Sequence, residues 1–392
     1  MLVVIEKHLD QIDGHHQTQI KSIENLAGRP LDIVITAKQS KMVLQKISII
    51  KRVLSTRTDR QHKPFAAIDS DVYALERIFK ERNGSGKLFV IIPTTDEHDF
   101  RVCLKLLKRN PNIATFSLRV LVYHKIDNLS DDERADLAKL INTESIILLT
   151  ETVSLAKLLK DKYNLPAINS FLLPCTINAN KSIHSPKERV VVKAQNHLKI
   201  GYLGGFRREK GASKLPEILT GLKNLINRSD SKFSIEFIMQ KAKYKSRFKL
   251  AIFNFKLMRS LRNKDKPDRE IKLTILDEEL SPAQFMNSVE SVDLLLIPYD
   301  LEKYRARGSG IIIDGVLAEK PIVYTEGIGM DEFLNFGNAE AASQLSDFAP
   351  NIMKILLNLQ PYRNNAKLAQ TALCARIQET SNFLKAMQCR PD

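Results

Sequence analysis

Short apolar runs alternate along the first half of the chain with stretches in which apolar residues recur at helical spacing. The runs predict strands and the stretches predict helices. The predicted strands are Leu2–Ile5, Leu31–Ile35, Phe65–Ile68, Leu88–Pro93, Phe116–Tyr123 and Ser145–Thr150. The predicted helices are Asp71–Arg82, Phe100–Lys108, Asp131–Ile141 and Ser154–Lys162. This alternation indicates a parallel sheet covered on both faces.

The second half repeats the pattern. Its predicted strands are Lys199–Leu203, Ser234–Met239, Lys272–Ile275, Val292–Pro298 and Pro321–Tyr324, and Leu215–Ile226 is a predicted helix. Ser281, Pro282 and Gln284 predict a helix start with an N-cap, a proline at the first helical position and a capping-box partner. Residues from Pro361 onward are typical of one or two helices.

Pro174 and the polar run Asn178–Lys187 interrupt the pattern and predict a linker. A chain of 392 residues suits two domains. We therefore predict an N-terminal α/β domain over 1–178, a C-terminal α/β domain over 190–360 and closing helices over 361–392. Open α/β sheets bind ligands at the C-terminal ends of their strands, so a cleft between the two domains is the expected site.

The composition is that of an ordinary globular protein, with 43% hydrophobic and 27% charged residues. No apolar run approaches the length of a membrane span, and the N-terminus is typical of a first strand rather than of a signal peptide. Cys103, Cys175, Cys374 and Cys389 lie far apart and form no metal-binding pattern. We expect a cytoplasmic protein without a metal site.

The net charge of +15 indicates an anionic partner, which could be nucleic acid, a nucleotide substrate or an anionic membrane surface. The sequence contains no recognisable nucleic-acid reader motif, zinc finger or aromatic-basic sheet signature. Nucleic acid is therefore the least favoured of the three.

The segment His197–Gly211 carries the strongest functional signal. An apolar run ends at two glycines, a group of cations follows, and a third glycine leads into a predicted helix; these residues are Gly204, Gly205, Arg207, Arg208, Lys210 and Gly211. Glycines allow close backbone approach, a helix N-terminus offers N–H groups and the cations supply charge. The segment predicts a phosphate site, with an ordinary strand-to-helix turn as the alternative. Its spacing fits neither the P-loop nor the dinucleotide fingerprint.

A second candidate element spans Tyr304–Pro321. Ser309 and Gly310 stand at the start of a predicted helix, where backbone N–H groups can take phosphate oxygens, and Asp314 follows about one turn later. The alternative is a helix with an N-cap serine and a surface aspartate.

The turn from Tyr202 to Gly211 resembles the "YLG-R-(four residues)-KG" turn of retaining glycosyltransferases with the GT-B fold, of the family-4-like group (glycosyl transferases group 1). There the Arg and Lys hold the diphosphate of a nucleotide-sugar donor. Lys210 and Gly211 match, whereas Gly205 stands at the family's Arg, so Arg207 or Arg208 would replace it. The resemblance implies two Rossmann-like domains facing across a cleft, with the closing helices crossing back to the first domain.

The second element resembles the family's helix "E-(seven residues)-E-A". Asp314 falls on the second Glu, which holds the ribose hydroxyls, and Ala306 replaces the first Glu, which is set near the sugar. This departure leaves open a relative with altered or lost activity. The segment Ser288–Tyr299 is similar to the strand that ends beside the donor sugar.

Two positions in the first domain match the family's acceptor side and sugar site. Gly14, His15 and His16 correspond in position to the β1–α1 loop that admits the acceptor, with a solvated turn as the alternative. His124, at the end of the predicted strand Phe116–Tyr123, matches the histidine that faces the transferred sugar. A hydrogen-bonded structural histidine is the alternative there.

The resemblance implies same-face attack by the acceptor while the diphosphate leaves. Lys210, Arg207 and the N–H groups near Ser309 would then stabilise the growing negative charge, and no metal is required. A competing motif, Asp69-Ser70-Asp71, follows the predicted strand Phe65–Ile68, as a metal-binding DxD does in single-domain glycosyltransferases. Asp71 also suits a helix N-cap, and the two C-terminal elements argue against the metal hypothesis.

The segment 241–264 contains nine Lys and Arg residues and no acid. Tyr244, Phe248, Ile252 and Phe255 recur in it at helical spacing, with Leu250, Phe253, Leu257 and Leu261 widening the apolar face. This pattern favours a helix lying on an anionic membrane surface, which would make the protein peripheral on the inner membrane face. A core-packed helix with a solvated cationic face is the alternative.

Together these features predict a metal-independent retaining glycosyltransferase. It would move a sugar from a nucleotide-sugar donor to a glycan or lipid-linked acceptor in cell-surface polysaccharide or glycolipid synthesis. A non-catalytic scaffold of the same fold is the main alternative, favoured by Gly205 and Ala306 and opposed by Lys210 and Asp314. A nucleic-acid binder, recognisable by steeply salt-dependent binding, is third.

Overall fold

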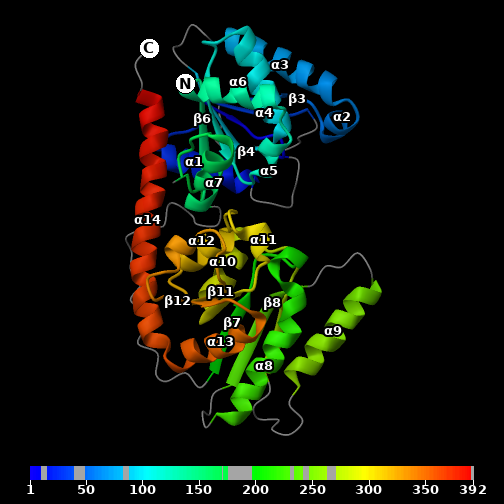
Figure 1. Ribbon diagram of the computed structural model, residues 1–392, viewed down its shortest axis with the longest axis vertical. Helices are drawn as coiled ribbons and strands as arrows, with labels where there is room; N and C mark the ends of the chain where they lie inside the picture. The colour runs from blue at the N-terminus through cyan, green and yellow to red at the C-terminus, as the bar shows by residue number, and fades with distance from the viewer. Residues whose placement is uncertain are drawn as a thin grey trace. The chain divides into compact units, whose positions relative to one another are not determined.

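The computed structural model describes residues 1–9, 16–38, 49–82, 88–169, 171–174, 197–229, 234–241, 247–262 and 271–389 (Figure 1). The chain divides into two compact units. One contains Met1–Cys175 and Arg376–Asp392, and the other contains Thr176–Ala375. Each unit has a six-stranded parallel sheet with helices on its faces, which confirms the predicted α/β class with two Rossmann-like domains.

The sheet of the first unit has the order β3-β2-β1-β4-β5-β6. Its strands are β1 (Leu2–Ile5), β2 (Ile33–Ala37), β3 (Ile50–Leu54), β4 (Phe89–Thr95), β5 (Thr115–Val120) and β6 (Ile146–Thr150). Its helices are α1 (His16–Ala27), α2 (Arg57–His62), α3 (Pro64–Lys80), α4 (Glu97–Arg109), α5 (His124–Asp127), α6 (Asp131–Asn142) and α7 (Val153–Tyr163). Ile20 and Ile23 of α1 pack on one face of this sheet.

The second unit repeats this topology, with the strand order β12-β11-β10-β7-β8-β9. Its strands are β7 (His197–Tyr202), β8 (Ser234–Gln240), β9 (Ile271–Leu276), β10 (Leu294–Ile297), β11 (Ile322–Thr325) and β12 (Ala339–Ala342). The helices are α8 (Leu215–Arg228), α9 (Arg247–Leu261), α10 (Pro282–Ser291), α11 (Leu301–Tyr304), α12 (Gly310–Leu317) and α13 (Phe348–Leu357). In both sheets the first and fourth strands are neighbours, so the strand order reverses between them.

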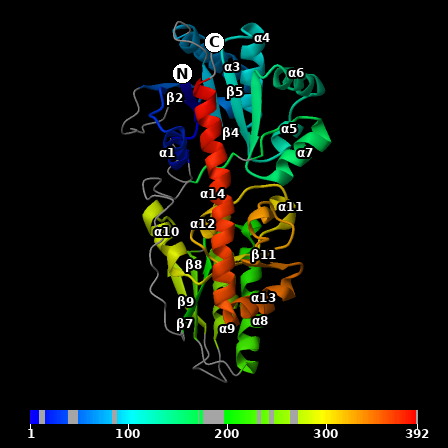
Figure 2. The ribbon, with the colours of Figure 1, turned by 90° about the vertical axis from the view of Figure 1, so that its left-hand side faces the viewer.

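The last helix, α14 (Leu359–Cys389), contributes to both units. Near its start, Gln370 Nε2 donates to Leu317 O of α12 at 2.7 Å, and Figure 2 shows this part of α14 beside α12. Near its end, Ser381 Oγ donates to Leu26 O of α1 at 2.7 Å. Leu384 and Met387 are buried in the core of the first unit.

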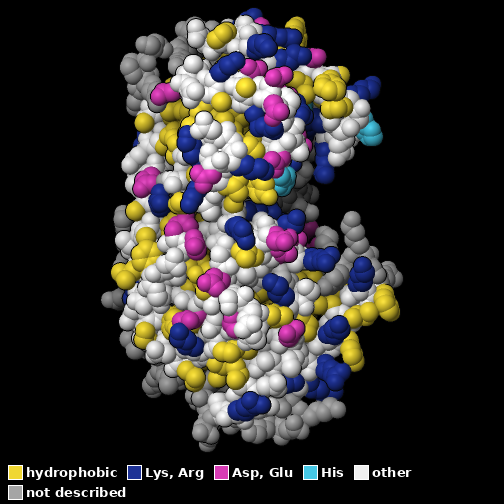
Figure 3. Space-filling view, in the orientation of Figure 1, with side chains coloured by type: hydrophobic (Ala, Val, Ile, Leu, Met, Phe, Trp, Pro, Cys, Tyr) yellow, Lys and Arg dark blue, Asp and Glu magenta, His cyan; other side chains and the backbone are white. Residues whose placement is uncertain are grey.

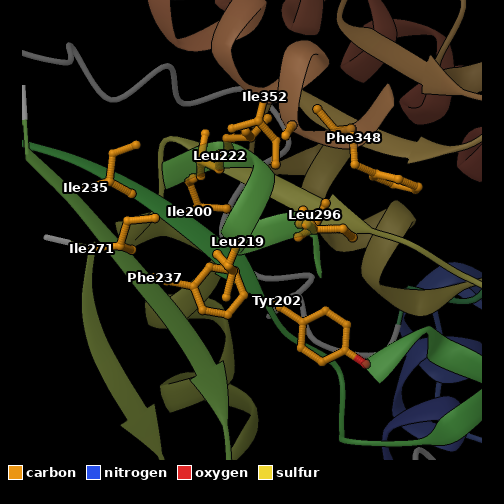
Figure 4. Close-up of a cluster of buried hydrophobic side chains, with 14 of the residues drawn as sticks. Ile200, Tyr202, Leu219, Leu222, Ile235, Phe237, Ile271, Leu296, Phe348 and Ile352 are labelled. Atoms are coloured by element: carbon orange, nitrogen blue, oxygen red, sulfur yellow. The ribbon is translucent and has the colours of Figure 1, made fainter. Parts of the chain in front are cut away.

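The hydrophobic core of the second unit fixes the position of its central strands. Leu219 and Leu222 of α8 and Ile352 of α13 pack against Ile200 and Phe237 of the sheet (Figure 4). Fully burying one such side chain stabilises a fold by roughly 1.5–3 kcal/mol. This packing makes the carboxyl end of β7 a rigid base for the loop that follows.

On the opposite face, α12 lies directly on the sheet because it carries a glycine. A Cβ at Gly315 would fall 2.4 Å from Leu295 Cδ1 of β10. The helix is buried along most of its length. This close packing fixes the position of the N-terminus of α12 relative to β7 and β10.

One predicted strand is wrong, and two observed strands were not predicted. The predicted strand Phe65–Ile68 is wrong, because these residues lie in α3, which begins at Pro64. Ala67, Ile68, Val72 and Leu75 point inward at helical spacing. The third strand is instead β3, and β12 was not predicted; both lie at the edges of their sheets and include polar or alanine-rich sequence.

The capping box at Ser281 is confirmed: Gln284 N donates to Ser281 Oγ at 3.3 Å, and Ser281 N donates to Gln284 Oε1 at 2.9 Å. The predicted helix after Pro361 forms part of α14. Among the described helices, none combines the length and the hydropathy that crossing a membrane requires.

Candidate donor site

The loops after β7 and β10 form one structure at the point where the strand order reverses. Gly211 has φ 78°, and a Cβ there would fall 1.9 Å from the carbonyl oxygen of Pro298. Asp300 N donates to Glu209 O at 2.9 Å, and Lys214 Nζ donates to Tyr299 O at 3.2 Å. Ligands of open α/β sheets bind at this position, beyond the carboxyl ends of the strands.

Lys210 is the most unusual residue of this structure. Its side chain is buried, with 8% of the residue exposed, and Nζ donates to the carbonyl oxygen of Gly204. Nζ also lies 5.8 Å from the centroid of the Tyr299 ring. In the part of the chain that the structure describes, no salt bridge joins Nζ to a carboxylate.

The surroundings of Lys210 disfavour its charged form. Burial, and then the charges of Arg207 and Arg307, lower the pKa of Lys210 to about 7, and Glu209 offsets only part of this effect. A buried ammonium group without a counter-ion is costly. A bound phosphate would supply the missing negative charge, so this environment fits an anion site.

Hydrogen bonds to Gln240, at the end of β8, hold the glycine turn in place. Gly204 (φ 96°) and Gly205 (φ 80°) donate their N–H groups to Gln240 Oε1 of β8, at 2.9 and 2.5 Å. Gln240 Nε2 donates to Glu278 O at 3.3 Å. The turn's N–H groups are thus already used by the protein, and what the turn offers a ligand is space: a Cβ at Gly205 would meet no atom within 4 Å.

Replacing Gln240 with alanine should therefore loosen the turn. We expect a loss of about 1–2 kcal/mol in the free energy of unfolding, because two N–H groups lose their acceptor. Gln360→Ala, on the exposed face of α14, is the matched control. Denaturant unfolding measures both variants; equal stability of Q240A and Q360A would contradict the assignment.

The N-terminus of α12 lies beside this turn. A Cβ at Gly204 would come 3.5 Å from Ile311 Cβ. The N–H groups of Ile312 and Ile313 donate to Ser309 O, so those of Gly310 and Ile311 precede the bonded part of the helix. The Ser309 side chain does not cap the helix; its Oγ lies 3.4 Å from the Tyr299 hydroxyl. The space beside Gly310 is open, since a Cβ there would meet no atom within 4 Å.

Asp314 is a buried residue in the middle of α12, with 4% of its surface exposed. The alternative of a surface aspartate is therefore wrong. Ala306, at the position of the family's first Glu, is also buried. Arg207 and Arg208 are exposed, and Arg207 pairs with Glu209 at 3.7 Å.

Arg307 belongs to the site although it was not a predicted site residue. Its guanidinium carbon lies 5.4 Å from the centroid of the Tyr304 ring, and its charge contributes to the lowered pKa of Lys210. Tyr304 in turn lies 4.2 Å from Tyr299, centroid to centroid. The cluster of cations before Gly308 was the available sequence signal. No local pattern pointed to Gln240.

The predicted residues of the first unit fall into three groups. Gly14 and His15 lie outside the described residues. His16 begins α1, with Nδ1 3.3 Å from Glu6 Oε2 and its ring 5.1 Å from that of His8. His124 is exposed and begins α5, whereas β5 already ends at Val120, so its placement at a strand end is wrong.

The DxD segment has a structural role. Asp69 and Asp71 lie within α3, so Asp71 is not an N-cap and the motif does not follow a strand. The exposed Asp69 pairs with Lys105. Asp71 is buried, accepts from Ser55 N at 2.6 Å and lies 2.8 Å from His98 Nε2. Among the described residues, no group of His, Cys, Asp and Glu is arranged to hold a metal ion.

Comparisons with known proteins identify the fold. No protein-family model and no curated protein matches the chain. A glycosyltransferase from Rickettsia africae ESF-5 matches with a TM-score of 0.64 and 13% identity, over 100% of this chain and 99% of that one. A UDP-forming α,α-trehalose-phosphate synthase from Burkholderia xenovorans matches with a TM-score of 0.60 and 10% identity, over 99% and 97%. The Anabaena protein Alr3699/HepE, in complex with UDP and glucose, matches with a TM-score of 0.59 and 11% identity, over 99% and 97%.

These similarities extend over essentially the whole length of each chain. The chain therefore has the GT-B fold, which confirms the resemblance at the level of the fold. Assignment to the family-4-like group stays a prediction.

Proposed function

We propose that this protein is a metal-independent retaining glycosyltransferase. It takes a sugar from a nucleotide-sugar donor and transfers it to a glycan or lipid-linked acceptor in the synthesis of a cell-surface polysaccharide or glycolipid. The observation that carries the proposal is the buried Lys210, without a carboxylate partner among the described residues, at the reversal point between β7 and β10. The similar structures support it, since they include a UDP-forming sugar synthase and a complex with UDP and glucose.

The site would act chiefly by electrostatics. Lys210, helped by Arg207 and Arg307, would stabilise the negative charge that grows on the leaving diphosphate. The N–H groups of Gly310 and Ile311 would face the same oxygens from the N-terminus of α12. These fixed donors supply the charge that a divalent cation provides elsewhere, so the reaction would need no metal.

The remaining residues have proposed roles that rest on the resemblance. Asp314 would hold the ribose hydroxyls, and Arg208 would assist at the donor diphosphate. Ser309, Gly204 and Gly205 would shape the space the donor occupies. On the acceptor side the proposal assigns Gly14, His15 and His16, and it assigns His124 to the transferred sugar.

A non-catalytic protein of the same fold is the second candidate. The observation that favours it is Ala306, which puts a buried methyl group at the position of the family's first Glu. The adjacent residue, Arg307, brings a positive charge instead of a carboxylate. Such a protein would bind a nucleotide without transferring a sugar, which separates the two candidates experimentally.

Thermal unfolding with a panel of nucleoside diphosphates and nucleotide sugars, with and without EDTA, tests the donor site. A ligand at 100 times its Kd should stabilise the protein by about 2.7 kcal/mol. We expect one base to stand out and EDTA to have no effect. Absence of any shift in folded protein would contradict the donor site.

Release of the nucleoside diphosphate from the selected donor, followed by NMR of the product's anomeric centre, then tests transfer. Retained configuration supports the proposal. Tight nucleotide binding without turnover, in the presence of lipid and glycan acceptors, would favour the non-catalytic candidate.

A further inference from the structure

Helix α9 has apolar side chains on two sides. Phe253, Leu257 and Leu261 are buried in the core of the second unit. The opposite side carries Phe248, Ile252, Phe255 and Met258, which are 74, 39, 68 and 56% exposed. We call these four residues the outer α9 face. Packing requires only one apolar side of a helix, and adjacent large apolar residues on a surface mark an interaction site.

The outer α9 face is surrounded by positive charge. Lys249, Lys256, Arg259 and Arg262 are exposed on the same helix and just beyond it. The sequence from Lys241 to Arg262 contains no Asp or Glu. Figure 3 shows hydrophobic and basic side chains gathered over α9, at the right of the view.

A basic groove adjoins this helix. A cavity of about 420 Å³ between α8 and α9 is lined by Pro216, Glu217, Thr220, Lys223, Lys256, Arg259 and Ser260. Lys223 Nζ donates to Arg262 O at 3.0 Å, which ties α8 to the end of α9. Three cations and one carboxylate line this shallow groove, and its net positive charge suits an anionic headgroup.

We propose that α9 docks the protein on an anionic membrane. The outer α9 face enters the interfacial region of the bilayer, and the surrounding cations and the α8/α9 groove hold lipid phosphates. Charge complementarity selects this partner: aromatic and aliphatic side chains ringed by Lys and Arg match a surface that is apolar within and anionic at its boundary. The sequence predicted a membrane-binding helix without separating the residues that face the core from those that would face the membrane. The structure separates these two sets of residues.

The helix is also attached to the candidate donor site. Phe206, which follows Gly205, packs edge-on against Phe253 with 4.9 Å between ring centroids. Membrane docking through α9 would therefore hold the glycine turn after β7 near the lipid surface. The proposal itself does not depend on catalysis, so it can be tested without substrate.

Cosedimentation of the 392-residue protein with vesicles is the test. One set contains phosphatidylcholine alone and the other contains phosphatidylcholine with phosphatidylglycerol. Wild type should pellet with the anionic vesicles and be released by high salt, because salt screens the charges. The double variant Phe248→Ser with Phe255→Ser should bind about 10-fold to 100-fold more weakly. Lys256→Glu with Arg259→Glu should lose at least about 10-fold.

The matched control is Phe65→Ser with Tyr73→Ser, a pair of exposed aromatic residues on α3 that are 81 and 67% exposed. This control should bind vesicles like wild type. All the exchanged side chains are exposed, so unchanged thermal unfolding is expected and is checked first. Failure of wild type to bind anionic vesicles would overturn the proposal, as would equal binding by the Phe248/Phe255 variant. A wild-type dimer in solution that the same variant dissociates, without vesicle binding, would overturn it in favour of a second copy of the chain.

Discussion

Lys210→Met should strongly weaken nucleoside-diphosphate binding and at the same time stabilise the unliganded protein. Burial and the neighbouring arginines lower the pKa of Lys210 from its ordinary 10.5 to about 7, which corresponds to an upper limit of about 5 kcal/mol of destabilisation. Methionine has a similar shape and no charge to bury. We therefore expect a higher melting temperature and an affinity for nucleoside diphosphates at least about 100-fold lower.

The stabilisation should depend on pH in a defined direction. The folded-state pKa of Lys210 lies below the unfolded value. Between about pH 7 and 10.5 the lysine is therefore mostly protonated in the unfolded chain and mostly neutral in the folded protein. Wild type should gain stability as the pH rises through this range. The advantage of the methionine variant should be largest at pH 7 and below, and should vanish towards pH 10.5. Lys367→Met, an exposed lysine of α14, should show neither effect.

Ligand binding should take up a proton at the same residue. A bound diphosphate favours the ammonium form and raises the pKa of Lys210, so binding at pH 8 should consume close to one proton. Titration calorimetry in buffers of different ionisation enthalpy measures this number. Affinity should fall by up to about tenfold per pH unit above 7. Proton uptake that persists in Lys210→Met would contradict the assignment to this lysine.

Gly211→Ala should destabilise the protein severely, whereas Gly205→Ala should not. Both glycines have positive φ, 78° and 80°, so each alanine incurs a similar backbone cost of about 1–2 kcal/mol. At Gly211 the new Cβ would also lie 1.9 Å from the Pro298 oxygen, and the loops after β7 and β10 would have to separate. We expect a total loss of at least about 3 kcal/mol there.

The two alanine variants separate stability from binding. At Gly205 nothing lies within 4 Å of the new Cβ, so the folded protein accepts it at the backbone cost alone. If the donor occupies this space, G205A should nevertheless weaken nucleotide binding. Urea unfolding and the thermal-shift panel measure the two effects. Equal stability of the two variants would disprove the close contact of Gly211 with Pro298.

The fold could be predicted from the sequence to the extent that its elements are local or fully buried. Strands such as β1 and β10 are continuous apolar runs because both faces of a parallel sheet are covered. The capping box at Ser281 is a contact between neighbours in the chain. Two edge strands, β3 and β12, escaped prediction. The strand Ile50–Leu54 includes Lys51 and Arg52, since one side of an edge strand meets solvent.

The error at Phe65–Ile68 has a related cause. Four residues with apolar side chains are too few to separate a strand from one turn of a buried helix. Only the continuation through Val72 and Leu75, packed on the sheet at helical spacing, decides it. The same error placed the DxD segment at the end of a strand. The carboxylate of Asp71 instead accepts a hydrogen bond from Ser55 N and lies 2.8 Å from His98 Nε2.

Local spacing was sufficient for the two-domain α/β fold and for the order of strand, glycine turn and helix over residues 197–228, because these elements follow one another directly in the chain. Local spacing could not predict which side chains are buried or which charges lie close together. Burial and then the charges of Arg207 and Arg307 lower the pKa of Lys210. Arg207 is a neighbour in the chain, but the burial and the approach of Arg307 arise because the sheet order places the loop after β10 against the loop after β7. Gln240 supports the turn because β8 adjoins β7, and α9 has an inner and an outer apolar side because only one of them meets α8. These properties arise from neighbours that are distant in sequence, so only the tertiary structure could decide them.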